Sequence, residues 1–544
     1  MKLKHLIFFA TLFLIAACAN RVVPTGGPKD ILPPKFIAAE PSNGTINFKS
    51  REIVLSFSEY LQLKDLPNQL LVSPLMDRKP EVKVSKKSIV IKLPEKLRDN
   101  TTYTINFGKA IADLHEGNTI ENFQYVFSTG PILDSLICSG TVRDAATLQM
   151  LKDVTVMLYK KSDSIATLDS LVFKQKPDYF SHTNENGSFE IKNIAPGYYS
   201  IFALEDKNGN YILDNPNEER MAFTGNTLTI PQTGTIELKV SKQHPSKRQY
   251  LKSQIGDRYR ATLIFNERID TLVIRDLVTG NLFSGVTEWS KGRDSLYVFM
   301  KDTIADSLHL LISSPPFIND TIQLKLSSTS IVKRRFTTNS LRVDIKKSPE
   351  FSGPTANIEF ELPRALAKIV GTPKLFVDTI PVPSTDFVVA RDSSSKRKII
   401  VTHKWKEGSS YQLLILPGTF TDFYGSTNDT INYRFKIPTA ENTAAVTIHA
   451  INLKDGGNYL LQVLTEKYEV VRQQIIDKSG KYDFNFIYPG SYIIRVVVDK
   501  NKNNMLDGSN YLDGTQPEEV FVSSTVTLRA NWELELELNC ASKE

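Results

Sequence analysis

The chain has 544 residues, too many for one hydrophobic core, so its length predicts several domains. Its formal net charge is only +6, and no aromatic–basic motif of a nucleic-acid-binding fold occurs, so nucleic acid is not expected as a partner. The three cysteines, Cys18, Cys138 and Cys540, exclude a disulfide framework, and hydrophobic cores must hold the domains instead.

The N-terminus, residues 1–17, has the features of a secretory signal peptide. Lys2 and Lys4 precede an apolar run, LIFFATLFLIAA, that is too short to span a bilayer. The run leads directly into Cys18, and this ending resembles the lipobox of bacterial lipoproteins, where the cysteine thiol receives diacylglycerol. The resemblance implies that Cys18 is lipidated and that its acyl chains tether the mature chain to a membrane. The alternative is an ordinary signal cleaved near Ala17, with Cys18 incidental.

The residues after Cys18 bear on which membrane holds the chain. Ala19-Asn20 lack an inner-membrane retention aspartate, so the outer membrane is expected. No acidic run follows, which favours the periplasmic leaflet over the cell exterior. Residues 18–35 are rich in Pro and Gly and have no apolar period, so they predict a spacer that lifts the first domain off the membrane.

Beyond residue 35, apolar residues alternate with a period of two. In REIVLSFSEY, for example, Ile53, Leu55 and Phe57 share one face of an expected strand. Similar strings recur about every ten residues, separated by Asn, Asp, Gly and Pro turns, and convincing amphipathic helices are scarce. The pattern predicts an all-β chain, a string of about five antiparallel β-sandwich domains.

One segment of the chain occurs twice. Residues 187–214 and 480–507 align without a gap and are identical at twelve of 28 positions, including a Pro-Gly turn and an Asp-Lys-Asn loop. The run NGSFEIKNIAPGYYSIFALED resembles the prealbumin-like, or carboxypeptidase-regulatory-like, β-sandwich. The resemblance implies two such domains, at residues 134–242 and 443–540.

The segment before each copy forms another repeat. The strand end Phe57-Ser58-Glu59, the strand Tyr103 to Phe107 and the turn in KAIADLHEGN resemble the bacterial SbsA-type Ig-like domain, here at residues 36–131. The same order recurs at residues 341–440, and a degenerate version is expected at residues 248–340.

The two Asp/Asn loops resemble half of a calcium-binding loop. Calcium prefers oxygen ligands, and the pattern places Asp or Asn at positions 1, 3, 5 and 9 of an EF-hand-like turn. The eight candidate ligands are Asp206, Asn208, Asn210 and Asp214, and Asp499, Asn501, Asn503 and Asp507. Position 6 lacks glycine and position 12 lacks glutamate, unless Glu218 or Glu518 folds back. The alternative is a long hairpin in which Asn and Asp stabilise the turns.

No catalytic motif is evident, so the sequence predicts no enzyme. The histidines are scattered, and neither zinc spacing nor a G-x-S-x-G elbow, P-loop or dinucleotide fingerprint occurs. Glu59 and Glu267, each after a strand phenylalanine, are the only recurring acidic candidates. The basic stretch SKQHPSKRQYLK predicts a solvated linker, with contact to lipid headgroups or lipopolysaccharide as the alternative.

These features together predict a lipid-anchored bacterial envelope protein that serves as a modular scaffold, adhesion or interaction protein. Its partners would be the membrane and an envelope protein or glycan. A second hypothesis is a carbohydrate-binding surface with Tyr198, Tyr211 and Tyr511 as aromatic platforms, and a third is a glycosidase-like enzyme.

Overall fold

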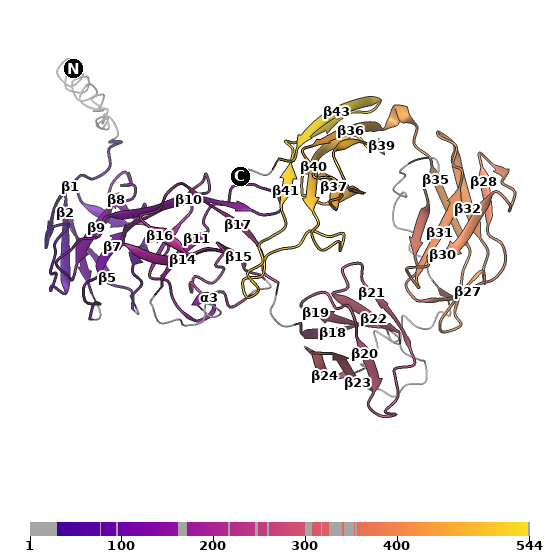
Figure 1. The fold of residues 1–544 in the computed structure, drawn as a ribbon, viewed down its shortest axis with the longest axis horizontal. Helices are drawn as coiled ribbons and strands as arrows, with labels where there is room; N and C mark the ends of the chain where they lie inside the picture. The colour runs from indigo at the N-terminus through magenta and orange to yellow at the C-terminus, as the bar shows by residue number, and fades with distance from the viewer. Residues whose placement is uncertain are drawn as a thin grey trace, which may run out of the picture.

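In the computed structural model, most of the chain beyond the N-terminus is built of β-strands (Figure 1). The structure describes residues 30–541, apart from residues 77, 94–95, 162–170, 216–217, 245–247, 258–259, 300–306, 317, 326–339, 342–352 and 354–355. The predicted signal peptide and Cys18 lie outside the described residues. Within the described residues, no helix has the length and apolar character needed to cross a bilayer.

The N-terminal sandwich has one core between its sheets. The sheets run β1-β2-β6-β5 and β4-β7-β9, with β3 and β8 as a separate pair. The alternation predicted for β2 is confirmed, because Ile53, Leu55 and Phe57 are all buried in that core. The elements are β1 (Phe36–Glu40), β2 (Glu52–Phe57), β3 (Leu61–Leu63), α2 (Leu66–Gln69), β4 (Leu71–Ser73), β5 (Glu81–Ser85), β6 (Ser88–Lys92), β7 (Thr102–Asn106), β8 (Ile111–Asp113) and β9 (Gln124–Ser128).

The first copy of the long repeat forms the next sandwich. Its strands run β12-β11-β14-β15-β17-β10-β13, and β16 pairs with β14. The buried side chains of this sandwich form two hydrophobic clusters, and Phe202 and Phe223 belong to the second of them. The elements are β10 (Leu136–Asp144), β11 (Thr155–Lys160), α3 (Leu171–Lys174), β12 (Tyr179–His182), β13 (Ser188–Ile194), β14 (Gly197–Leu204), β15 (Arg220–Phe223), β16 (Leu228–Ile230) and β17 (Ile236–Lys242).

The second copy repeats this pairing scheme. Strand β36 pairs antiparallel with β39 and parallel with β43, as β10 does with β13 and β17. Strand β40 pairs with β37, β41 and β42, as β14 does with β11, β15 and β16. The elements are β36 (Ala444–Ile451), β37 (Tyr459–Thr465), β38 (Val470–Ile476), β39 (Gly480–Ile487), β40 (Gly490–Val498), β41 (Val520–Val522), β42 (Val526–Leu528) and β43 (Trp532–Asn539).

Two further cores lie between the copies. The first is formed by sheets β18-β19-β22-β21 and β20-β23-β24. Their strands are β18 (Tyr250–Asp257), β19 (Arg260–Phe265), β20 (Val273–Asp276), β21 (Val286–Trp289), β22 (Ser295–Phe299), β23 (Ser307–Ser314) and β24 (Ile318–Lys325).

The second intervening core is formed by sheets β26-β31-β30, β29-β28-β32-β35 and β25-β34-β33-β27. The elements are β25 (Ser340–Leu341), β26 (Ile358–Glu361), β27 (Leu366–Ile369), β28 (Lys374–Val377), β29 (Ile380–Pro381), β30 (Phe387–Arg391), β31 (Lys398–His403), β32 (Ser410–Ile415), β33 (Phe420–Asp422), β34 (Thr427–Asn428), β35 (Ile431–Lys436) and η2 (Ala440–Asn442). The all-β, mostly antiparallel sandwich architecture is confirmed, and the exact domain limits stay predictions.

The sandwiches do not follow one another as a simple string. The C-terminal strands, yellow in Figure 1, return to the magenta strands of the first copy. The Ser241 and Ser509 hydroxyls lie 2.8 Å apart, and Gln243 donates a hydrogen bond to Ser509. Arg495 donates to the carbonyl of Ala146 at 3.0 Å. The string predicted from the pattern is therefore folded back, because turns of the second copy pack on the first.

A second contact joins the two intervening sandwiches. The buried Arg397 donates a hydrogen bond of 3.1 Å to Glu288 and stacks its guanidinium on the Tyr297 ring, 4.5 Å from the centroid. Phe486 of β39 packs against the core of residues 358–437. Together with the contact between the two copies, these interactions close residues 134–540 into a ring of sandwiches.

Candidate functional site

The first aspartate of each Asp/Asn loop organises the turn from within. Asp206 Oδ1 accepts a hydrogen bond from the Gly209 amide at 2.8 Å, and Oδ2 accepts one from Tyr211 at 2.7 Å. Asp499 binds the Asn503 and Asn504 amides in the same way, at 3.1 and 2.8 Å. Tyr211 and Asn504 have φ of 64° and 63°, so these residues adopt the left-handed backbone at the position that EF-hand loops give to glycine.

The remaining predicted ligands converge on the last aspartate of each loop. Asn208 and Asn210 direct their side-chain Nδ2 atoms to the Asp214 carboxylate, at 3.1 and 2.6 Å. In the second loop, Asn501 and Asn503 do the same toward Asp507, at 2.5 and 2.7 Å. The structure therefore brings the eight predicted residues together as two sets of four.

In each loop a buried glutamate accepts hydrogen bonds from two backbone amides. Glu219 accepts hydrogen bonds from the Lys207 amide at 3.2 Å and the Asp214 amide at 3.3 Å. Glu518 accepts them from the Lys500 amide at 2.9 Å and the Asp507 amide at 3.0 Å. In the first loop the glutamate is Glu219, not the expected Glu218, and its burial is complete.

The gapless alignment hides the equivalence of Glu219 and Glu518. These two residues are 299 positions apart, whereas the aligned loops are 293 apart, so the second copy carries six extra residues after Asp507. A search for the last acidic residue before the next strand would have found Glu219, which directly precedes β15, but in the second copy it gives Glu519, one residue beyond Glu518. Burial and the nearby Asp507 and Asp499 raise the pKa of Glu518 above its usual range, against the opposing effect of its backbone hydrogen bonds.

The loops carry carboxylate and side-chain amide oxygens, the type of ligand that calcium prefers. The four asparagine side chains turn their nitrogen atoms, not their oxygens, toward Asp214 and Asp507. Within the described residues, no group of three or more His, Cys, Asp or Glu side chains is placed to hold a metal ion. The residues fit calcium only after a half-turn of these amides, and calcium binding remains a prediction.

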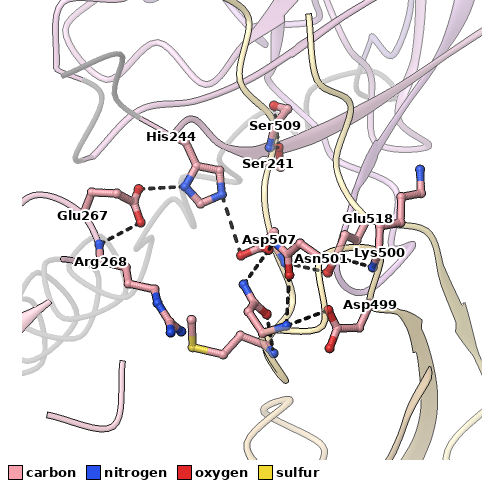
Figure 2. A network of polar contacts seen from close by, with 12 residues as sticks. Ser241, His244, Glu267, Arg268, Asp499, Lys500, Asn501, Asp507, Ser509 and Glu518 are labelled. Carbon is pink, nitrogen blue, oxygen red and sulfur yellow. Dashed lines mark hydrogen bonds and ion pairs between the residues drawn. The ribbon is translucent and has the colours of Figure 1, made fainter. Parts of the chain in front are cut away.

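The second loop meets two other segments at a polar junction (Figure 2). His244, which follows β17, has its Nδ1 2.7 Å from Glu267 Oε2 and its Nε2 3.9 Å from Asp507 Oδ1. Glu267 follows β19, so the imidazole lies between carboxylates from two separate sandwiches. The hydrogen bond that His244 donates to Glu267 raises the pKa of His244, against the effect of burial.

A cleft of about 390 Å³ opens at this junction. Its lining is mostly charged and amide side chains, among them Arg248, Arg268, Asn510 and Asp513. The Glu267 carboxylate lies in the same cleft and accepts a further hydrogen bond from the Arg268 amide at 3.0 Å. Burial raises the pKa of Glu267, but hydrogen bonds from His244 and Arg268 outweigh it and leave the pKa low, the opposite of what a general acid requires.

The two recurring acidic candidates are not brought together. Glu59 lies beside Ser58 in the N-terminal sandwich, where the hydroxyl donates to it at 3.3 Å, whereas Glu267 lies at the polar junction. The basic stretch also differs from its prediction. Ser241 and Gln243 are buried against Ser509, because the six-residue insertion of the second copy covers them, whereas Lys242 is exposed and residues 245–247 lie outside the described residues.

The three tyrosines considered as a carbohydrate platform have different environments. Tyr198 is exposed, but Tyr211 packs edge-on against Phe180, with ring centroids 4.8 Å apart. Tyr511 packs edge-on against Phe202 and Phe223, at 5.1 and 5.2 Å. A shared platform of these rings is therefore absent, because two of them bury their faces in aromatic clusters.

Comparison with known proteins gives one assignment within the chain. No curated protein matches it. Similar solved structures include the major pilin subunit BcpA of Bacillus cereus, with 13% identity over 75% of this chain and 100% of that chain and a TM-score of 0.13. The S-layer protein rSbsC has 10% identity over 91% of this chain and 67% of that chain, with a TM-score of 0.14.

A third similar structure is the glucan-utilisation protein SGBP-B of Bacteroides ovatus, in complex with a mixed-linkage heptasaccharide. Its identity is 10% over 84% of this chain and 100% of that chain, and its TM-score is 0.19. TM-scores this low do not establish a shared overall architecture with any of the three. The family model described as the bacterial Ig-like domain matches residues 30–129, which identifies the N-terminal sandwich as a bacterial Ig-like domain.

Proposed function

We propose that this chain is a lipid-anchored protein of the bacterial envelope that acts as a non-enzymatic scaffold of β-sandwich domains. The lipobox at Cys18 supports the anchor, and the bacterial Ig-like domain directly after it supports an envelope location. The N-terminal sandwich would be of the SbsA type, and the two repeat copies would be prealbumin-like. The anchor would lie in the outer membrane, with the chain on the periplasmic face.

The contact between the two repeat copies carries the scaffold proposal. Independent domains on flexible linkers would present their surfaces in many relative positions. Here the buried hydroxyls of Ser241 and Ser509 and the aromatic contacts of Tyr511 hold two sandwiches in one orientation. A scaffold gains from such a contact, because binding surfaces on separate sandwiches are then pre-organised for one partner.

Metabolic labelling with an alkyne fatty acid tests the anchor. The wild-type chain should carry the label and fractionate with outer membranes, whereas Cys18→Ala should lose both properties. Cys138→Ala is the matched control and should keep the label, because Cys138 is buried in β10. An unlabelled wild-type chain in the cytosol would contradict the proposal. If the anchor is confirmed, crosslinking in intact cells followed by membrane pull-down would identify the partner.

A carbohydrate-binding function is the second candidate, and the cleft at the polar junction is the observation that favours it. Its arginine, asparagine and aspartate side chains are hydrogen-bonding groups of the kind that fix sugar hydroxyls. Titration calorimetry with β-glucan and mannan oligosaccharides tests this candidate. Binding that is lost in Arg268→Ala and Asn510→Ala but kept in Tyr198→Ala would support the cleft over the exposed tyrosine.

A further inference from the structure

We propose that the N-terminal sandwich docks directly on the bilayer surface that holds the anchor. The docking patch consists of four apolar side chains, Ile31, Leu32, Tyr60 and Leu114, together with the exposed lysines Lys64, Lys86 and Lys87. This inference rests on the proposed lipid anchor and adds a second membrane contact to it. The sandwich would then lie against the membrane and not be held away from it by a spacer.

Backbone contacts show that the patch is continuous. The Leu114 amide donates to the carbonyl of Tyr60 at 2.9 Å, which places these two side chains on neighbouring strand ends. Asn118 of the same turn donates its side-chain amide to the carbonyls of Asp30 and Leu32, at 3.1 and 3.3 Å. The first described residues therefore lie across the turn that carries Leu114.

The lysines frame these apolar side chains. Lys64 donates to the carbonyl of Gly117 at 2.8 Å, and Lys87 donates to the carbonyl of Ser58 at 2.8 Å. The Lys87 ammonium also lies 5.7 Å from the Tyr60 ring centroid. The adjacent Lys86 is exposed, and its carbonyl accepts a hydrogen bond from the Leu61 amide at 3.1 Å.

The chemistry of the patch suits a phospholipid interface. Ile31 is 78% exposed, Leu32 57%, Leu114 49% and Tyr60 47%. Each of these side chains would therefore bury apolar surface on contact with acyl chains. Tyrosine favours the headgroup level, and lysine side chains can extend along a bilayer to reach phosphate oxygens. Exposed Asp30 and Glu116 at the margin leave little net charge, so apolar insertion must supply most of the affinity.

The length of chain before the patch places it within reach of the membrane. Residues 30–35, expected to be part of the spacer, are bound to the sandwich, since the Ser58 amide donates a hydrogen bond to the backbone carbonyl of Lys35 and Pro34 is buried. Only 11 residues then lie between Cys18 and Asp30, and the 12 steps along the chain (30 − 18) span at most about 40 Å when fully extended. The N-terminal sandwich also forms one end of the elongated molecule, so docking there leaves the ring of sandwiches unobstructed (Figure 1).

Coupling residues 18–544 through Cys18 to a maleimide lipid reproduces the tether in vitro, whether or not the cell lipidates this residue. The other two cysteines should not compete near neutral pH, because burial raises the pKa of Cys138 and Cys540 to about 12. The vesicles contain phosphatidylethanolamine and phosphatidylglycerol, with bromine on part of the acyl chains. A tryptophan placed by Leu114→Trp should be quenched by the bromine relative to the same chain on unbrominated vesicles.

A matched control uses the exposed turn after β20, in which Val278 and Leu282 are 79% and 62% exposed. A tryptophan placed by Val278→Trp should not be quenched. In the Leu114→Trp background, the double change I31D/L32D should abolish quenching, whereas V278D/L282D should leave it unchanged. Without a tether, the I31D/L32D chain should partition to the same vesicles at least about tenfold less than the V278D/L282D chain.

Equal quenching of the two tryptophans, or equal effects of the two double changes, would overturn the docking patch. A protein receptor at this surface would show as binding that needs membrane extract and is missing with pure lipid, which also overturns it. Failure of the anchor is read separately, from the fatty-acid label on Cys18 in cells. The two proposals can therefore fail independently.

Discussion

Truncating Tyr511 should release the contact between the two repeat copies. The ring packs edge-on against Phe202 and Phe223, and each such aromatic pair contributes about 0.5–1.5 kcal/mol beyond the area that it buries. Two pairs therefore account for about 1–3 kcal/mol, and the lost burial of the half-buried ring adds about 1 kcal/mol. Tyr511→Ala should lower the free energy of opening this interface by about 2–4 kcal/mol.

Hydrogen exchange at the interface measures this loss directly. The His244 amide donates to the Ser509 carbonyl at 2.8 Å, and the Ser509 amide donates to the Ser241 hydroxyl at 2.9 Å. Both amides exchange when the copies separate, so Tyr511→Ala should speed their exchange about 30- to 700-fold, at tenfold for each 1.4 kcal/mol.

Tyr198→Ala is the matched control for a lost tyrosine, because Tyr198 is exposed on the same sandwich that receives Tyr511. It should leave exchange at the interface within about twofold of the wild type. A double-mutant cycle between Tyr511→Ala and Phe223→Ala should give a coupling energy of about 0.5–1.5 kcal/mol. Unchanged exchange in Tyr511→Ala, or a coupling energy of zero, would refute the interlocked arrangement.

Three further predictions concern Asp113, the two buried cysteines and the two Asp/Asn loops. Asp113 accepts four backbone amides of its turn, which outweigh burial and hold its pKa below 3.8, so the stability that it contributes is present above pH 4 and lost as pH falls through the lowered pKa. Asp113→Asn should destabilise the N-terminal sandwich by about 1–3 kcal/mol and flatten the acid limb of its melting curve, as seen by calorimetry. Cys138 and Cys540, with pKa values raised to about 12, should resist iodoacetamide in the folded chain and react in denaturant, and mass spectrometry that finds rapid labelling of either would contradict their burial. If the loops bind calcium with a Kd of about 0.1 mM, 1 mM calcium should stabilise each copy by about 1.4 kcal/mol, an increment lost in Asp206→Asn and Asp499→Asn; no shift of the melting midpoint would remove the idea.

Local patterns were informative wherever the chain interacts with its near neighbours. The alternation of Ile53, Leu55 and Phe57 predicted their shared core face, because successive side chains of a strand point to opposite sides. The Asp/Asn loops were predictable for a similar reason. Asp206 binds amides no more than five residues away, so the turn chemistry is contained in the quoted string.

Features that join distant segments were not predictable in this way. Glu219 was missed because a six-residue insertion shifts its counterpart, Glu518, out of the gapless alignment. The insertion has no apolar period from which its role could be predicted, but it supplies Ser509 and Tyr511 to the contact with the first copy. The junction of His244 with Glu267 and Asp507 likewise joins three segments whose separation in sequence carries no signal.

The amino-acid sequence by itself determined the strand content, the duplicated sandwich, the turn chemistry of the loops and the lipobox expectation. Each of these depends on residues within about one strand or turn of each other, where side-chain period and backbone preference act directly. Only the tertiary structure decided that the two copies pack together and that the basic linker is partly buried. Those outcomes depend on how surfaces more than 260 residues apart complement each other, as Ser241 and Ser509 do across 268 residues, and no local period encodes that fit.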